Sequence, residues 1–193
     1  MKKKFLLILA TILIIVACKN DEDNDVFTIE TFHQDYYNIN ISPAIVNLKS
    51  EIEKQIVLSE RLKNDTSIEN LNKLQEQWLI SAKAFSKTKA YNVLAIKALY
   101  YDIILYNFPI KTEFIENNIA EKTNYNSDYF RNNSTVSKGL GTLEYLLYNN
   151  QNTNTALSLL KENSYRIDYL LGVTEDVLKQ TNLLINFWES EYK

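Results

Sequence analysis

Two of the three glycines in this 193-residue chain stand close together, just before an apolar run. Gly139 and Gly141 precede Glu144 in the segment Thr135 to Tyr148. Glycine permits positive backbone φ angles, and the free amides at the start of a helix attract negatively charged groups. Both glycines and Glu144 could therefore form a ligand-binding turn. The spacing alone favours the other interpretation, an ordinary turn into a helix with an acidic residue that the helix dipole stabilises.

Glu144 is also the candidate metal ligand. One carboxylate supported by backbone oxygens favours a hard ion held weakly over zinc held tightly. A stronger site would need further carboxylates to converge on Glu144, for example Glu113, Glu116 or Asp168. The sequence leaves these three unassigned and assigns no catalytic residue.

The single histidine and the single cysteine exclude several classes of site. One thiol and one imidazole cannot form an internal disulfide, a zinc finger or a site of several imidazoles. His33 stands in an aromatic segment with Phe32 and Tyr36, where a surface or hydrogen-bonded role is favoured over metal ligation. The formal charge is -3, and it becomes -6 without the basic leader, so we expect no nucleic-acid partner.

Residues 1–17 are predicted to be a lipoprotein signal peptide. Three lysines precede an apolar run, Phe5 to Ala17, that is too short to span a bilayer comfortably. The end of this run, Ile15 to Cys18, resembles the lipobox of bacterial lipoproteins; an uncleaved anchor, or a secretory leader with an incidental cysteine, is the alternative. The resemblance implies acyl chains on Cys18 that bind the protein to the cell envelope, in the outer membrane, facing the periplasm or the cell surface. Residues 18–25 are predicted to be an acidic, flexible tether.

Helices must position these candidate residues, because three glycines and two prolines are too few for a sandwich or barrel. A first helix is expected after Pro43, with an apolar stripe that runs towards Leu62. Residues Thr66 to Glu69 have capping-box spacing, so a second helix should begin there with Thr66 as its cap. Its apolar stripe runs from Leu71 to Phe85 and predicts an antiparallel hairpin with the first helix.

The remaining chain should supply two more long helices and a loop. Dense apolar residues predict that Ala90 to Tyr106 form the most buried helix, ended by Pro109. A short helix is expected from Thr112 to Glu121, and the polar residues 122–133 predict a functional loop. The last helix carries an apolar stripe from Ile167 to Trp188, where Gly172 indicates a close approach of another element.

The glycine segment resembles the signature region of the imelysin-like family, in which Gly-x-His-x-x-Glu precedes an aliphatic run. Here the corresponding letters run from Gly139 to Glu144. Other features of this chain match the family in the same order along the sequence. They are Trp78, Asn107 to Pro109, Phe114 to Glu116, Arg166 to Leu170, and Trp188. The resemblance implies an all-α fold: a single up-and-down bundle of about four main helices plus short helices, covering residues 26–193 and resembling one half of an imelysin-like protein.

The family resemblance also implies an exported protein linked to iron uptake, with metal-dependent peptidase activity in some members. Gly141 replaces the motif histidine, so only Glu144 carries over as a functional side chain. Our leading hypothesis is a non-catalytic envelope lipoprotein that binds a ligand, or weakly a metal ion such as iron, through residues 122–133 and the glycine turn. A peptidase with a degenerate site and a structural partner of a separately encoded second bundle are the alternatives.

Overall fold

The computed structural model describes residues 28–149 and 152–192. The predicted signal peptide, Cys18 and the tether therefore lie outside the described residues. The chain divides into two compact units, residues 1–33 and 34–193. Helix α2 (Ile29–Tyr36) contains the last described residues of the first unit, and all later elements belong to the second. Within the described ranges, no helix is both long and apolar enough to cross a membrane.

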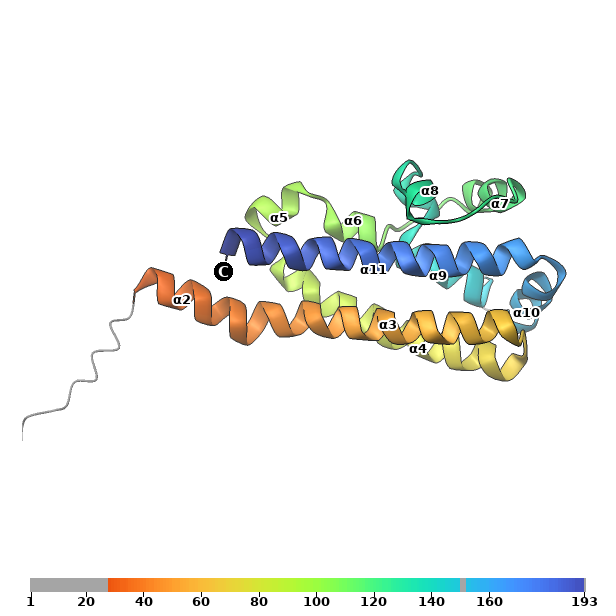
Figure 1. Ribbon diagram of the computed structural model, residues 1–193, viewed down its shortest axis with the longest axis horizontal. Coiled ribbons are helices and arrows are strands. Elements are labelled where there is room, and N and C mark those ends of the chain that lie inside the picture. Colours follow the sequence, from red (N-terminus) through yellow and green to blue (C-terminus); the bar gives the residue numbers. More distant parts are fainter. Residues whose placement is uncertain (1–27, 150–151, 193) are drawn as a thin grey trace, which may run out of the picture. The chain divides into compact units, whose positions relative to one another are not determined.

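The second unit is a bundle of four main helices (Figure 1): α3 (Ser42–Asn64), α4 (Ile68–Thr88), α9 (Gly139–Tyr148) and α11 (Ser164–Tyr192). Helix α3 packs against both α4 and α11, while α9 packs against α4 and α11. An ion pair of 2.7 Å between Lys63 and Asp168 joins the end of α3 to the start of α11, so these helices run antiparallel. The predicted helical hairpin and bundle are confirmed.

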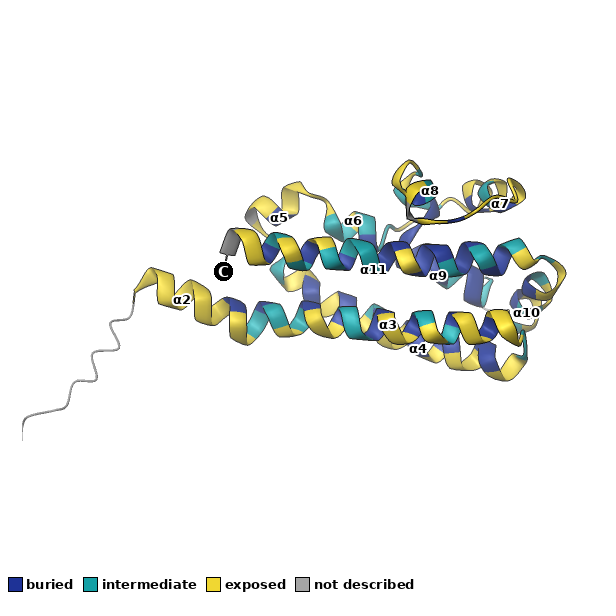
Figure 2. Cartoon of the chain, in the orientation of Figure 1, coloured by how far each residue is buried: buried dark blue, intermediate teal, exposed yellow. Residues whose placement is uncertain are grey.

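The core lies where the apolar stripes of the long helices meet (Figure 2). Leu48 and Ile52 on α3, Leu71 and Leu74 on α4, and Leu170 on α11 are completely buried. These residues recur at steps of three and four, so each helix turns one continuous face towards its neighbours. The sequence pattern therefore predicted this part of the core correctly.

The cap of α4 differs from the prediction by one residue. Ser67, and not Thr66, is the N-cap, and its hydroxyl accepts a hydrogen bond from the Asn70 amide at 3.4 Å. The Thr66 hydroxyl instead donates to the Leu62 carbonyl at the end of α3, and Glu69 pairs with Lys73. Both hydroxyls precede the helix, so the sequence alone does not distinguish them, and the hydrogen bonds of the folded chain do.

The prediction of one deeply buried helix from Ala90 to Tyr106 is wrong. The chain forms a short 3₁₀ turn (Lys89–Tyr91) and two single-turn helices, α5 (Leu94–Ala98) and α6 (Tyr101–Leu105). Tyr100 has a φ of 56°, in the left-handed region, which separates the two helices. The break lets Ile96 and Leu105 reach the core, while other apolar side chains of the same stretch stay exposed: Val93, Leu99, Tyr100 and Ile103.

The prediction of a loop from Lys122 to Asn133 is also wrong in part. The segment contains helix α8 (Ser127–Arg131), capped by the Asn126 side chain, and it buries Tyr125 and Phe130. Both aromatic residues pack against α11 at Gly172, where an added Cβ would overlap the Tyr125 carbonyl oxygen. The close approach predicted at Gly172 is therefore confirmed, and it explains why a polar stretch is ordered.

The remaining helices connect these parts. A π-helical turn (Tyr37–Ile41) leads into α3. Helix α7 (Thr112–Ala120) confirms the predicted short helix after Pro109, and it precedes a 3₁₀ turn (Thr135–Ser137). Helix α10 (Thr153–Glu162) lies between α9 and α11 and packs against both.

Candidate functional site

The glycine turn has the backbone geometry that the sequence predicts, but its start is covered. Gly139 has a φ of 78°, and a Cβ there would lie 2.8 Å from the Leu105 carbonyl oxygen. A Cβ on Gly141 would lie 2.5 Å from the Asn107 carbonyl oxygen. The turn before α7 thus occupies the space that an imidazole at position 141 would need. Both glycines of the turn are buried, and of the two Gly141 alone borders an open pocket.

That pocket, called the Glu144 pocket below, has a volume of about 400 Å³. Helix α4 contributes Trp78 and Leu79 to its lining, and the segment before and at the start of α7 contributes Phe108, Ile110 and Thr112. Helix α9 contributes Gly141, Glu144, Tyr145 and Tyr148. Clefts of this size with many aromatic walls and few polar groups are typical of small-molecule sites.

Glu144 lies one helical turn after Gly141, so its carboxylate faces the same pocket. The Tyr106 hydroxyl donates a hydrogen bond of 2.9 Å to Oε2 of Glu144. Burial, followed by the hydrogen bond to Glu144, raises the pKa of Tyr106 from 10 to about 12, so the phenol remains a hydrogen-bond donor into the alkaline range. The hydrogen bond from Tyr106 holds Oε2 of Glu144 in place, and the carboxylate offers a hydrogen-bond acceptor to the pocket.

The aromatic walls are held from behind by hydrogen bonds. Nε1 of Trp78 donates to the Leu140 carbonyl at 3.0 Å, and the Tyr148 hydroxyl donates to the Gln75 carbonyl at 2.8 Å. The Trp78 and Tyr148 rings stand 5.5 Å apart at an angle of 70°. Because their polar atoms are already bonded to backbone, these rings offer the pocket mainly their apolar surfaces.

Tyr145 connects the pocket to a partly buried ion pair. Its hydroxyl donates to Oε1 of Glu116 at 2.8 Å, and Nη1 of Arg166 donates to both oxygens of Glu116, also at 2.8 Å. The Arg166 guanidinium also lies over the Tyr145 ring, 5.5 Å from its centroid. Arg166 is buried within the bundle, and its contact with the Tyr145 ring helps to hold that ring in place.

The structure separates Glu144 from the other candidate ligands. Glu116 bonds to Arg166 and Asp168 pairs with Lys63, while Glu113 is exposed on α7. Among the described residues, no three His, Cys, Asp or Glu side chains lie close enough to hold a metal ion. His33 is exposed on α2, its ring 6.1 Å from that of Phe32. Metal binding by Glu144 therefore stays a prediction.

Residues 122–133, which were expected to share the ligand site with the glycine turn, border a different hollow. Thr123, Asn124 and Asn126 line a polar pocket of about 270 Å³ beside Asp168. None of the residues that line this hollow also lines the Glu144 pocket. The two parts of the predicted site therefore do not form one pocket.

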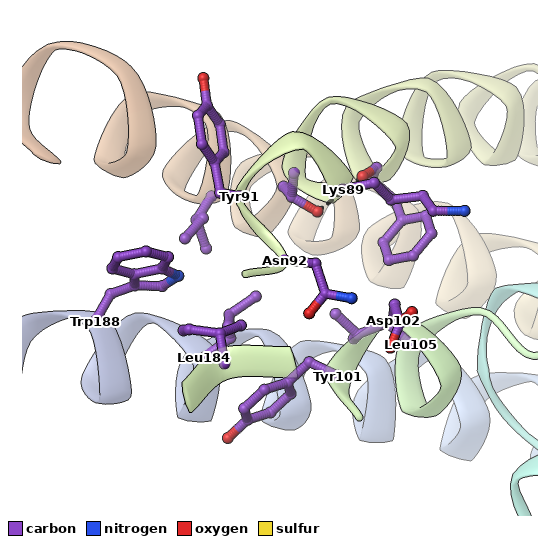
Figure 3. A pocket seen from close by; sticks show the side chains of 12 residues that line it. Lys89, Tyr91, Asn92, Tyr101, Asp102, Leu105, Leu184 and Trp188 are labelled. Atoms are coloured by element: carbon purple, nitrogen blue, oxygen red, sulfur yellow. Dashed lines mark hydrogen bonds between the residues drawn. The ribbon is translucent and has the colours of Figure 1, made fainter. Parts of the chain in front are cut away.

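A third cavity lies between α4, α6 and the end of α11 (Figure 3). Its volume is about 20 Å³, room for roughly one water molecule. Asn92 stands near the centre of the lining, with Tyr101 below it and Asp102 to its right in the view (Figure 3), and Oδ1 of Asn92 is buried without a protein hydrogen-bond partner. We interpret this cavity as a structural water position, because it is too small for a substrate.

The sequence did not identify the pocket's aromatic residues as functional. The apolar stripe of α4 indicates a core position for Trp78, and nothing in the sequence distinguishes Tyr145 or Tyr148 from packing residues. Tyr106 falls at the end of a predicted helix, and Phe108 enters only through the family resemblance at Asn107 to Pro109. The useful signal was the break at Asn107 to Pro109, because it directs Phe108 outward, where 79% of its surface is exposed. The spacing of residues along the chain could not show that this break lies beside α9, because the two segments are distant in sequence.

Three comparisons with known proteins bear on this arrangement. The family model described as imelysin matches residues 44–193. A solved structure of an imelysin-like protein from Psychrobacter arcticum 273-4 is similar, with a TM-score of 0.70 and 16% sequence identity. The similarity covers 84% of this chain and 50% of that one, so this chain spans about half the length of that structure. No curated protein matches the chain. At this identity the structural likeness shows the fold alone.

Proposed function

Because the chain belongs to the imelysin family, we propose that it is an envelope-anchored, ligand-binding member whose site is the Glu144 pocket. One observation carries the proposal: a single carboxylate and four aromatic side chains surround about 400 Å³ at the position of the family signature. A small molecule with an apolar body would bury its surface against these rings. The role is binding and not catalysis, since Gly141 stands at the position of the signature histidine and its space is filled by Asn107.

A pocket-filling variant tests the binding role. The neutral fluorophore N-phenyl-1-naphthylamine should bind the wild-type protein saturably, with an increase in its fluorescence. Leu79 lines the pocket and is about half exposed, so Leu79→Trp should reduce binding at least tenfold without lowering the melting temperature. Leu183→Trp, at an exposed position of α11 outside the pocket, is the matched control. Equal binding by wild type and Leu79→Trp would contradict the proposal.

The link to a metal ion, including iron, rests on the family resemblance and on Glu144. Calorimetric titration of a soluble form that begins after Asp25, with ferrous, ferric and zinc ions, tests it directly. A hard ion held by one carboxylate should bind weakly, and Glu144→Ala should abolish the heat. Heat that this substitution leaves unchanged would remove Glu144 from the metal-binding residues.

The membrane anchor rests on residues 1–18, which precede the described part of the chain. The basic start, the apolar run and Cys18 support cleavage before the cysteine and its acylation. Each buried methylene of an acyl chain contributes about 0.8 kcal/mol, so several chains attach the protein stably to a bilayer. Mass spectrometry of protein from its native host should find an acylated Cys18 as the first residue. An attached leader or a free thiol would contradict this part of the proposal.

A second candidate role is that of a partner for another imelysin-like bundle. The observation that favours it is apolar exposure in the segment between α4 and α9, at Val93, Ile103, Phe108 and Phe114. Exposed apolar groups of this kind are typical of protein interfaces. A neighbouring reading frame that encodes such a bundle, and a 1:1 complex on co-expression, would support the role. A complex unaffected by Ile103→Ser together with Phe114→Ser would contradict it.

A further inference from the structure

We propose that the Glu144 pocket selects an organic cation, such as a quaternary or alkyl ammonium group on an apolar body. The inference rests on the proposed function, because it names the class of ligand that the pocket accepts. It follows from the charge of the lining, the arrangement of the rings and the size of the space.

The charge of the lining is negative, and the cation behind its wall, Arg166 over the Tyr145 ring, is already paired with Glu116. Glu144 is the single acidic residue among those that line the pocket, and the lining contains no lysine, arginine or histidine. Tyr106 supplies one neutral hydrogen bond to Oε2 of Glu144. A neutral or anionic ligand would leave the half-buried carboxylate without a counter-charge, whereas a cation would supply it.

Two rings form a corner in which a cation is further stabilised. Trp78 and Tyr148 meet edge to face at 70° with centroids 5.5 Å apart, and both line the pocket. Trp78 is only 5% exposed, so Tyr148 and the other rings supply most of the aromatic surface that a ligand can reach. The face of an aromatic ring carries negative electrostatic potential and attracts cations. Tyr145 follows Glu144 on α9, and the exposed Phe108 ring stands at the rim. Carboxylate and ring faces therefore favour the same sign of charge.

The volume distinguishes an organic cation from a bare metal ion. About 400 Å³ accommodates a ligand of several carbon atoms, while a metal ion would fill a small part of it. A metal ion also needs several oxygen or nitrogen ligands, and the lining supplies one carboxylate. An ammonium group needs no coordination geometry and gains from a carboxylate and ring faces together.

The test compares choline with 3,3-dimethylbutan-1-ol, its uncharged carbon isostere, on the full-length chain in dodecyl maltoside. Calorimetry, corrected for titration of each compound into protein-free micelles, gives the two affinities. Choline should bind at least tenfold more tightly than the alcohol. Glu144→Gln should reduce choline binding at least tenfold and leave the alcohol unchanged. Phe108→Leu, at an exposed rim position, should weaken choline binding about threefold.

Glu113→Gln is the matched control, because it removes an exposed carboxylate of α7 that lies outside the lining. It should leave choline binding unchanged. Equal affinity for choline and the alcohol, or Glu144→Gln binding choline like wild type, would overturn the inference while the pocket remains a ligand site. If N-phenyl-1-naphthylamine does not bind either, the proposed function itself fails. The two failures are thus separate results.

Discussion

The long helices and the connecting segment between α4 and α9 (residues 89–138) use apolar residues differently. On α3, α4 and α11, the stripe residues such as Leu48 and Leu74 are completely buried. In the connecting segment, Ile96 and Leu105 are buried, but Ile103 and Phe108 are exposed. An apolar residue thus reports packing where it falls on the periodic stripe of a long helix; off the stripe it stays exposed, as Leu79 on α4 and Leu183 on α11 do. Where short helices break the pattern, it also marks surface available to a ligand or partner.

The largest effect is expected where the two regions meet. A Cβ on Gly172 of α11 would overlap the Tyr125 carbonyl oxygen and lie 2.8 Å from Cε2 of Phe130. Gly172→Ala should therefore cost about 3 kcal/mol of the free energy of unfolding, the upper range for overpacking. Urea denaturation measures it. A loss below about 1 kcal/mol would show that the connecting segment moves away from Gly172 at little cost. The segment would then be only loosely packed on α11.

A pair of substitutions tests whether equally apolar residues contribute equally. Leu74→Ala removes a completely buried side chain of α4 and should cost about 3 kcal/mol, because it leaves a cavity. Ile103→Ala, in the connecting segment, should change the free energy of unfolding by less than about 0.5 kcal/mol. Thermal and urea unfolding of both variants provide the comparison. Similar losses would mean that the exposed residues belong to the same packed core.

The pH dependence of stability should reflect the tyrosines packed between the regions. Burial raises the pKa of Tyr169 from its ordinary value of 10 to about 12, and its hydroxyl donates to the Ser137 carbonyl. The unfolded chain therefore loses this proton first, and stability should fall as the pH rises from about 10 to about 12. Tyr169→Phe should reduce that fall by roughly 2 kcal/mol, measured by urea unfolding at each pH. An identical pH profile in wild type and variant would contradict this.

The smallest expected effect concerns the N-cap of α4 and tests which residue begins this long helix. Ser67→Ala should cost about 1 kcal/mol, because the Asn70 amide loses its acceptor. Thr66→Ala should cost about half as much, since Thr66 bonds only to the Leu62 carbonyl. Thermal unfolding of the two variants distinguishes them. The reverse order would restore Thr66 as the cap.

The sequence predicted the long helices well and the connecting segment poorly, for the same reason. Periodicity over many turns is a strong signal, and it placed the faces of α3, α4 and α11 correctly. Residues 89–106 are also rich in apolar residues, like the long helices. The left-handed turn at Tyr100 contains no glycine or proline, so the sequence does not indicate that the helix breaks there. Residues 122–133 look polar, yet Tyr125 and Phe130 anchor them against Gly172.

For the candidate site, the sequence by itself determined Glu144, the glycine beside it and the family resemblance. These are local, because a glycine's freedom and a residue's place on one helix depend on near neighbours along the chain. Only the tertiary structure decided that Trp78 and Phe108 stand across from Glu144, and that Asn107 fills the space above Gly141. Such contacts join residues far apart in sequence. They depend on how several helices pack at once, which no single stretch of residues specifies.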